Sequence, residues 1–422
     1  MRAIERFLGA SAVYTLSRIS TGAISFLLLP ILTRYLSPED YGTLGIIGAT
    51  LGVLSPLVGF NPFLFIITKY HKLGAEEIKK YVSNNLIIVC ATVCIFVPIA
   101  SLARGAINEY LGLPLWTFNL IILLAGLGCI FSILLSFFQI EERPVIYGFF
   151  QVSKLLMTIS LALYLVVARG WGWEGRFLGD VMAALLFGGL ACYIMIKHKY
   201  IILDFCQERI LAFLRFSIPL LPHVIGLWVI NAIDRYFVAN MVGMAEAGVY
   251  TVAYSIAMIV GIVHDSLLKA WSPIFYKKIN EADRLAEVKH KLVKYTYYYF
   301  LLSILMGLIF CIFAPPFMRI FVGEKFRGGS AYIFWIVMGY TFNGMYKTVA
   351  GYIYHVNLTY ILAMITLLAA IINIVLNYIL IRAYGAVGAA QATFIAFLLS
   401  YIITHLVSAR LYPMPWLKLH KV

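Results

Sequence analysis

Long apolar stretches separated by short breaks of charged and turn residues recur along the whole chain. Two of them, residues 120–138 and 360–380, are almost continuously apolar. A spanning helix needs about 20 apolar residues, whereas a membrane β-strand alternates over about 10 residues. The pattern therefore predicts helices. The twelve expected spans lie near residues 9–33, 42–68, 82–103, 115–140, 146–168, 177–196, 216–241, 247–275, 293–316, 330–353, 358–381 and 386–408.

Composition agrees with this interpretation. The 422 residues are 62% hydrophobic and 12% charged, whereas a soluble domain has about 45–50% apolar and about 25% charged residues. The expected fold class is an all-α integral membrane protein, which excludes a soluble enzyme, a disordered chain and a coiled coil. The sequence has no phosphate loop, zinc helix or nucleophile elbow, and its six cysteines lack metal-ligand spacing. We expect no catalytic residue, metal or cofactor.

The basic residues predict an orientation. If the expected spans alternate in direction, 20 of the 33 Lys and Arg residues fall in the terminal and even-numbered loops, 8 in the odd-numbered loops and 5 within spans. The positive-inside rule then places both termini in the cytoplasm. The basic loops 69–80, 197–215 and 277–294 are typical of segments that meet anionic membrane lipids. The net charge of +14 therefore requires no nucleic-acid partner.

The two halves of the chain resemble each other. Residues 33–70 and 234–278 both contain Arg-Tyr at their start, end in an aromatic stretch that runs into Lys, and share a glycine, Gly42 against Gly248. The offset is six expected helices, and an even offset predicts parallel repeats, as in several transporter folds. We expect two pseudo-symmetric six-helix lobes, residues 1–208 and 209–422.

Polar residues within the spans are candidate functional residues, because a charge at the centre of a spanning helix costs about 2.5–3.5 kcal/mol on insertion scales. Such residues persist mainly where they face a wet cavity or a partner. The candidate cations for binding an anionic substrate are Arg18, Lys154, Arg235, Lys269 and Lys347. The expected polar lining consists of Ser11, Thr15, Ser25, Gln139, Gln151, Asn231, Asn373 and Asn377. Asp234, Asp265 and His264 are candidate titrating groups for coupling.

Structural roles compete with these functional ones. Asp265 and Lys269 lie one helical turn apart and could pair with each other, and Asp234 could be held by the neighbouring Arg235. His264 could be a hydrogen-bonded core residue. For Asp180 the structural reading is favoured, because it is expected in the first turn of its helix, one turn after Arg176.

Four segments resemble a known family. They are LPILTRYLSPEDYG (29–42), FSIPLLPHVIGLWVINAIDRYFV (216–238), AEAGVYTVAY (245–254) and YGAVGAAQAT (384–393). They are similar to the Wzx-type flippases for lipid-linked oligosaccharides, in the multidrug/oligosaccharidyl-lipid/polysaccharide (MOP) superfamily of MATE-like exporters. The resemblance implies two lobes around a central cavity that opens to each side in turn. It also implies transport of undecaprenyl-pyrophosphate-linked oligosaccharide, or a similar polyprenyl lipid, to the periplasmic leaflet of the bacterial inner membrane.

The resemblance also implies a role in making a surface polysaccharide such as O-antigen or capsule. Membrane lipids, a coupling proton or sodium ion, and the polymerase and chain-length machinery are the implied partners. Two features depart from neighbouring branches. The chain has little room for the two extra helices of peptidoglycan-precursor flippases, and its first helix has Arg18 but no acid, unlike many drug exporters. A polytopic glycosyltransferase or polymerase and a drug or cation antiporter are the alternatives.

Overall fold

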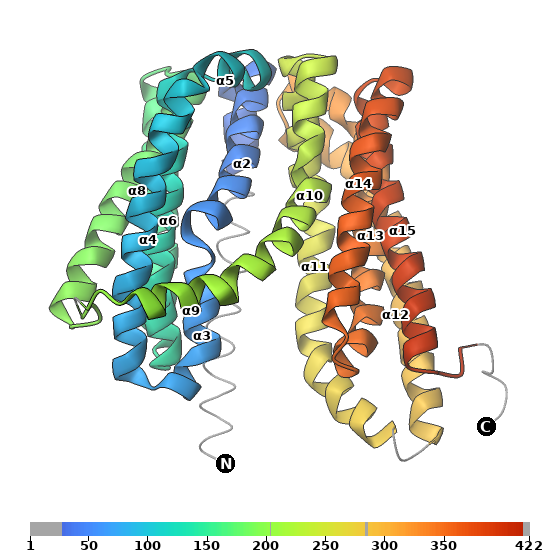
Figure 1. The fold of residues 1–422 in the computed structure, drawn as a ribbon. Helices are drawn as coiled ribbons and strands as arrows, with labels where there is room; N and C mark the ends of the chain where they lie inside the picture. Colours follow the sequence, from blue (N-terminus) through green and yellow to red (C-terminus); the bar gives the residue numbers. More distant parts are fainter. Residues whose placement is uncertain (1–27, 203, 283–285, 417–422) are drawn as a thin grey trace. The chain divides into compact units, whose positions relative to one another are not determined.

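The computed structural model describes residues 28–202, 204–282 and 286–416, and these are helical over most of their length (Figure 1). Their contacts divide the chain into two compact units, one ending at Val224 and the other beginning at Ile225. The lobe boundary expected between residues 208 and 209 stays a prediction.

Unit 1 begins, within the described residues, with a helical segment at 28–35. It continues with α2 (Pro38–Gly59), α3 (Pro62–Leu73), α4 (Ala75–Leu102), α5 (Arg104–Leu111), α6 (Leu115–Ile140), α7 (Pro144–Leu163), α8 (Gly172–Lys197) and α9 (Gln207–Ser217). A short 3₁₀ turn, Ile218–Leu220, leads to α10 (Leu221–Met241). Unit 2 holds most of α10, then α11 (Met244–Ala282), α12 (Ala286–Phe321), α13 (Ser330–His355), α14 (Thr359–Tyr384) and α15 (Ala386–Leu411).

The span expected at 42–68 is not one helix, which corrects the sequence-based prediction. α2 begins at a capping box in which Ser37 and Asp40 bond each other's backbone N–H groups. It ends at Phe60 and Asn61, whose φ angles are both 53°. A left-handed pair of residues cannot continue a right-handed helix, and Pro62 begins α3 where its missing N–H is no loss. α11, the expected counterpart in the second half, continues unbroken.

α6 is the central helix of unit 1. It packs against α2, α3, α4, α5, α7 and α8, and Figure 1 shows α4, α6 and α8 running side by side. Thirteen of its 26 residues are buried. Ring contacts of Phe131 with Phe187 (centroids 6.0 Å apart) and of Phe65 with Phe213 (5.1 Å) extend this core to α8 and α9. The expected span 115–140 is confirmed.

Glycines bring α7 and α8 close together. α7 passes into a five-residue π-helix, Tyr164–Ala168, and α8 crosses this region with Gly175 and Gly179. A β-carbon at Gly179 would lie 2.9 Å from the backbone nitrogen of Ala162. Small residues four apart permit such backbone approach between membrane helices.

The helix α9 lies in a segment expected to be a loop. Its position is fixed by Asn84 of α4, whose amide donates to the carbonyl of Asp204 (2.8 Å) and accepts from the N–H of Cys206 (3.0 Å). Arg209 then pairs with Glu77 and with Asp204, both at 2.7 Å. These contacts attach α9 to the first turns of α4.

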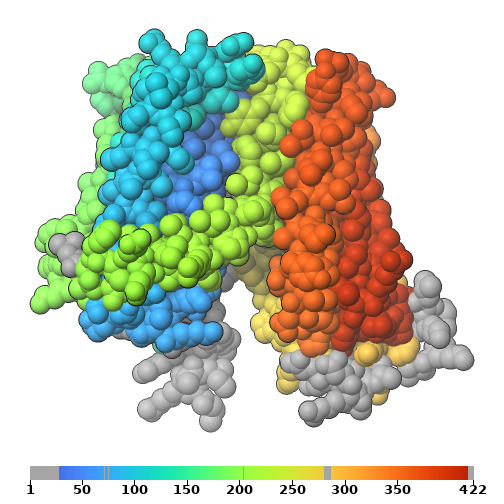
Figure 2. Space-filling model, in the orientation of Figure 1, coloured from blue at the N-terminus to red at the C-terminus, as the bar shows by residue number. Residues whose placement is uncertain are grey.

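α13 is the most enclosed helix of unit 2. It packs against α11, α12, α14 and α15, and 16 of its 26 residues are buried. Ten of the described helices are long and apolar enough to cross a membrane, and α13, which has more polar residues than α14, is not among them. Enclosure by protein explains the polar residues, because α13 does not need a lipid-facing surface. Figure 2 shows α14 on the surface of unit 2, where Met364 (63% exposed) and Ile371 (61%) are suited to face lipid.

Candidate functional site

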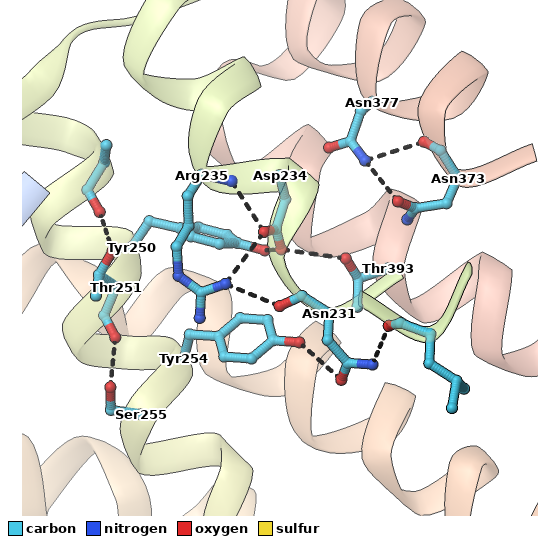
Figure 3. A network of polar contacts seen from close by, with 12 residues as sticks. Asn231, Asp234, Arg235, Tyr250, Thr251, Tyr254, Ser255, Asn373, Asn377 and Thr393 are labelled. Atoms are coloured by element: carbon cyan, nitrogen blue, oxygen red, sulfur yellow. Dashed lines mark hydrogen bonds and ion pairs between the residues drawn. The ribbon is translucent and has the colours of Figure 1, made fainter. Parts of the chain in front are cut away.

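A polar network lies at the junction of α10, α11 and α15, and Asp234 is at its centre (Figure 3). The Asp234 side chain is 1% exposed. Its Oδ2 accepts hydrogen bonds from Tyr250 Oη (2.6 Å) and Thr393 Oγ1 (3.4 Å), and its Oδ1 accepts from the Arg235 backbone N–H (2.9 Å). A buried carboxylate requires such donors, because desolvation without hydrogen bonds is very costly.

The guanidinium of Arg235 is held within the same network. It lies 3.6 Å from Asp234 Oδ1, donates to the Asn231 carbonyl at 2.8 Å, and stands 4.4 Å above the ring of Tyr254. Only 14% of its side chain is exposed. Asp234 and Arg235 are therefore paired, which is the structural role that the sequence suggested as an alternative for Asp234.

Asn231 strengthens the contact with α11 and links the network to one further helix, α13. Its amide nitrogen donates to the Leu227 carbonyl at 2.7 Å, and its Oδ1 accepts long hydrogen bonds from Tyr254 (3.5 Å) and from Tyr340 of α13 (3.4 Å). Asn231 therefore joins α10 to α11 and α13.

A pair of asparagines on α14 extends the polar region (Figure 3). Asn373 and Asn377 are fully buried, and the Asn377 amide nitrogen donates to the carbonyl (2.9 Å) and the side-chain oxygen (3.1 Å) of Asn373. Among the described residues, Asn373 Nδ2 and Asn377 Oδ1 have no hydrogen-bond partner. The pair therefore retains one free donor and one free acceptor in the interior.

Asp265 pairs with a different lysine from the one expected. Its Oδ1 lies 2.5 Å from the Nζ of Lys347 on α13, and the two side chains are 48% and 37% exposed. The alternative pairing with Lys269 is wrong. Lys269 is exposed and, within the described part of the chain, has no acidic partner within 4 Å. The ion pair thus joins α11 to α13 and stays accessible.

His264, the neighbour of Asp265, points into the core of unit 2. It is 1% exposed, and its Nδ1 lies 2.8 Å from Tyr299 Oη of α12. Its Nε2 has no partner among the described residues. The ring packs against Gly344, where a β-carbon would lie 2.6 Å from it. The arrangement is that of a hydrogen-bonded core histidine.

In unit 1, Lys154 of α7 has the most unusual surroundings of the candidate cations. Its ammonium lies 4.4 Å from the centroid of the Phe131 ring, and no acidic group lies within 4 Å among the described residues. On the same helix, Gln151 donates to Tyr147 Oη at 3.1 Å. Gln139, at the end of α6, is half-buried.

Asp180 has the structural role that the sequence favours. Of the two reasons given for it, pairing with Arg176 and a position in the first helical turn, only the first holds. Asp180 pairs with Arg176 at 2.5 Å. However, α8 begins at Gly172, so Asp180 is not in the first turn and the helix-terminus argument is wrong. The remaining candidates Arg18, Ser11, Thr15 and Ser25 lie outside the described residues.

The arrangement of the helices matches that of solved membrane transporters. An inward-facing multidrug transporter of the MATE family and MOP superfamily has a TM-score of 0.69 and 13% identity, covering 94% of this chain and 97% of its own. The lipid II flippase MurJ in an inward closed conformation has the same TM-score and 16% identity, covering 96% and 87%. The chain therefore has the fold of these multi-pass membrane transporters.

Sequence comparison assigns the family. The profile of the polysaccharide biosynthesis protein family matches residues 8–279, and the MatE profile matches residues 219–379. The chain belongs to the polysaccharide biosynthesis protein family.

Two relatives illustrate its range. A Haemophilus influenzae protein of the Lsg locus is 22% identical over 376 residues, covering 86% of this chain and 88% of its own. The succinoglycan biosynthesis transport protein ExoT of Rhizobium meliloti is 22% identical over 278 residues, covering 64% and 54%. The family resemblance expected from the four sequence motifs is confirmed.

Proposed function

We propose that the protein is a flippase that moves a polyprenyl-pyrophosphate-linked oligosaccharide repeat unit from the cytoplasmic to the periplasmic leaflet by alternating access. Family membership supports a role in a polysaccharide pathway, and the fold shared with MurJ, named as a lipid II flippase, supports a polyprenyl lipid as substrate. The main support for a substrate with an anionic headgroup is Lys154. Its ammonium lies inside a helix bundle and has no acidic group within 4 Å among the described residues.

Such a cation lowers the cost of moving an anionic headgroup through the membrane, which is the main physical obstacle to transport. Moving an isolated ion into hydrocarbon costs on the order of tens of kcal/mol by Born solvation. Lysine side chains inside the bundle replace part of the lost hydration of a pyrophosphate. The lipid tail can stay in the bilayer throughout. An inside-negative potential then favours outward movement of an anion by about 2.3 kcal/mol per charge and 100 mV.

The membrane location and the coupling are further parts of the proposal. We propose that the chain lies in the bacterial inner membrane with both termini in the cytoplasm, and that the lipid-linked unit it moves is used for O-antigen, capsule or a similar polymer. Proton or sodium coupling through Asp234, Asp265 or His264, and contact with a polymerase and chain-length regulator, stay predictions. Of the two acids, Asp265 is the more accessible.

The test is to identify the lipid-linked intermediates in a strain that lacks the gene but retains its glycosyltransferases. We expect a complete repeat unit to accumulate on polyprenyl pyrophosphate, together with loss of the surface polymer. An intermediate shortened by one sugar would instead indicate a glycosyltransferase. Normal polymer together with drug sensitivity would indicate a drug antiporter.

Variants test the role of the interior cations. Lys154→Met and Lys347→Met should both fail to restore the polymer, although they insert in normal amounts. Lys79→Met is the matched control, because Lys79 pairs with the exposed Glu76 near the start of α4 and should restore full export. Full export by both interior variants would contradict the cationic binding model.

A further inference from the structure

The turn between the π-helix and α8 holds a tryptophan in an unusual setting. Gly170 and Gly172 flank Trp171 and have φ angles of 69° and 56°, a conformation that glycine adopts at little cost. The Trp171 side chain is 50% exposed. Two left-handed glycines therefore direct an indole outward from a tight turn, and the position is not part of a regular helical face.

Asp40 fixes this turn to the start of α2. One of its carboxylate oxygens accepts the backbone N–H of Ser37 at 3.0 Å, and the other accepts the N–H of Trp173 at 3.3 Å. A β-carbon on Gly172 would lie 3.2 Å from the same carboxylate. Asp40 thus completes the capping box of α2 and also anchors the tryptophan-bearing turn.

Two open hollows lie beside this turn and the helix α5. Figure 1 shows α5 at the end of unit 1 that is opposite to α3. The first has a volume of about 490 Å³ and is lined by Asp40, Trp171, Trp173 and Glu174 among others. The second, of about 570 Å³, is lined by residues that include Arg104, Asn108 and Trp116. Their volumes lie within the range of small-molecule sites.

A pair of stacked indoles connects the two hollows. The rings of Trp116 and Trp173 have centroids 5.9 Å apart and are inclined by only 15°. Trp116 lines one hollow and Trp173 the other. A ligand longer than one ring could therefore contact both hollows by crossing the stack.

The surface differs from an ordinary interfacial belt of aromatic residues. Belt tryptophans sit at the headgroup level of the bilayer, whereas here the aromatic rings share one hollow with the carboxylates of Asp40 and Glu174. The Glu174 side chain is exposed and has no ion-pair partner in the described part of the chain. Acidic groups are disfavoured beside anionic lipid headgroups, but they are good acceptors for hydroxyl groups.

Sugars combine the two properties that this surface offers to a ligand. A pyranose ring has an apolar C–H face that packs on an indole, and its hydroxyl groups donate to carboxylates and amides. We propose that the two hollows and the stacked indoles, the tryptophan surface, bind the sugar portion of the transported lipid on the side where it is released. The proposal rests on the proposed function. It adds a second subsite that recognises sugar, separate from the interior cations.

The distribution of basic residues in unit 1 predicts on which side of the membrane the tryptophan surface lies. The opposite end of unit 1 carries Lys69, Lys72, Lys79, Lys80, Lys197 and Lys199, and the positive-inside rule places such an end in the cytoplasm. The tryptophan surface then faces the periplasm. A headgroup that has left the interior cations would meet it there.

The experiment measures binding of free sugars to the purified full-length protein in detergent micelles. The probe is a mixture of di- to pentasaccharides obtained by mild acid hydrolysis of the surface polysaccharide of the strain that supplies the gene. Saturation-transfer NMR detects binding, and titration gives the affinity. We expect Trp171→Ala and Glu174→Ala each to weaken binding about 3- to 10-fold, and Trp171→Phe to restore most of the loss.

Tyr193→Ala is the matched control, because Tyr193 is a 59% exposed aromatic residue near the other end of α8. It should bind sugar as the wild type does. Equal affinity of Trp171→Ala and wild type, or an equal loss in Tyr193→Ala, would overturn the proposal. The result is independent of the deletion experiment. If Trp171→Ala lost sugar binding but the deletion strain accumulated no lipid-linked intermediate, the proposed flippase function would be refuted and the sugar site would be retained.

Discussion

Replacing Tyr250 by Phe removes one hydroxyl from the core of unit 2 and changes little else. Tyr250 is fully buried, and its hydroxyl donates to Asp234 at 2.6 Å. Without this donor, Oδ2 of the carboxylate retains, among the described residues, only the long hydrogen bond from Thr393, at 3.4 Å. The protein should fold, because the ring of Phe fills the same space, but it should be less stable.

The size of the loss follows from the charge of the acceptor. A hydrogen bond to a charged group contributes about 1.5–3 kcal/mol, whereas one between neutral groups contributes about 0.5–1.5 kcal/mol. Tyr352 offers a matched control. It is also fully buried, and its hydroxyl contacts the neutral Thr296 Oγ1 at 3.4 Å. Tyr250→Phe should therefore lower the free energy of unfolding by at least about 1 kcal/mol more than Tyr352→Phe.

The assay is reversible unfolding in mixed micelles of dodecyl maltoside and SDS, followed by circular dichroism. A double-mutant cycle with Asp234→Asn isolates the charged part of the hydrogen bond. In the Asp234→Asn background, Tyr250→Phe should cost no more than the neutral value. Equal losses for Tyr250→Phe and Tyr352→Phe, or no coupling with Asp234, would refute a charged hydrogen bond at this position.

Three further changes test separate parts of the structure. Lys347→Met should change the free energy of unfolding by less than about 1 kcal/mol in the same assay, since its ion pair is half-exposed; a larger loss would indicate a buried pair. Gly179→Ala should destabilise by about 1–3 kcal/mol through overpacking, whereas Gly189→Ala, with nothing within 4 Å, should not. In a cysteine-free background, Trp171→Cys should react with an impermeant maleimide added outside spheroplasts, and Phe205→Cys only after lysis; the reverse pattern would invert the predicted topology.

The spans were predictable where sequence signals and packing agree. Residues 115–140 are bounded by Pro114 and by Glu141, and α6 begins and ends there. The interruption at Phe60 and Asn61 was not predictable from hydropathy, because Phe rarely adopts a left-handed conformation and continues the apolar pattern. The helix α9 was missed for a different reason. It is too short and too polar for a span, and its position depends on contacts with Asn84 and Glu77, more than 120 residues away.

The candidate site was predictable as a set of residues but not as a set of pairs. Sequence spacing suggests partners one turn apart, and this succeeds for Arg176 with Asp180. It fails for Asp265, whose partner Lys347 is 82 residues away on another helix. Tyr250 and Thr393 were missed as partners of Asp234, since no local spacing connects them. The available signal for Thr393 was a spaced series of polar residues along an otherwise apolar span, which continues with Ser400, Thr404 and Ser408.

The interior cations differ in what they can offer to an anionic headgroup. Arg235 is held by Asp234, by the Asn231 carbonyl and by the ring of Tyr254, so a phosphate would gain little there. At Lys347 the ion-pair partner within the described part of the chain that a phosphate has to displace is the carboxylate of Asp265. A half-exposed ion pair of this kind contributes about 0–1 kcal/mol. Lys154 interacts with an aromatic ring that attracts it more weakly than a phosphate would. Neutralising these residues should therefore weaken headgroup binding most at Lys154, less at Lys347 and least at Arg235. The opposite order would refute this ranking, and unchanged binding in all three variants would mean that these cations do not bind the phosphates.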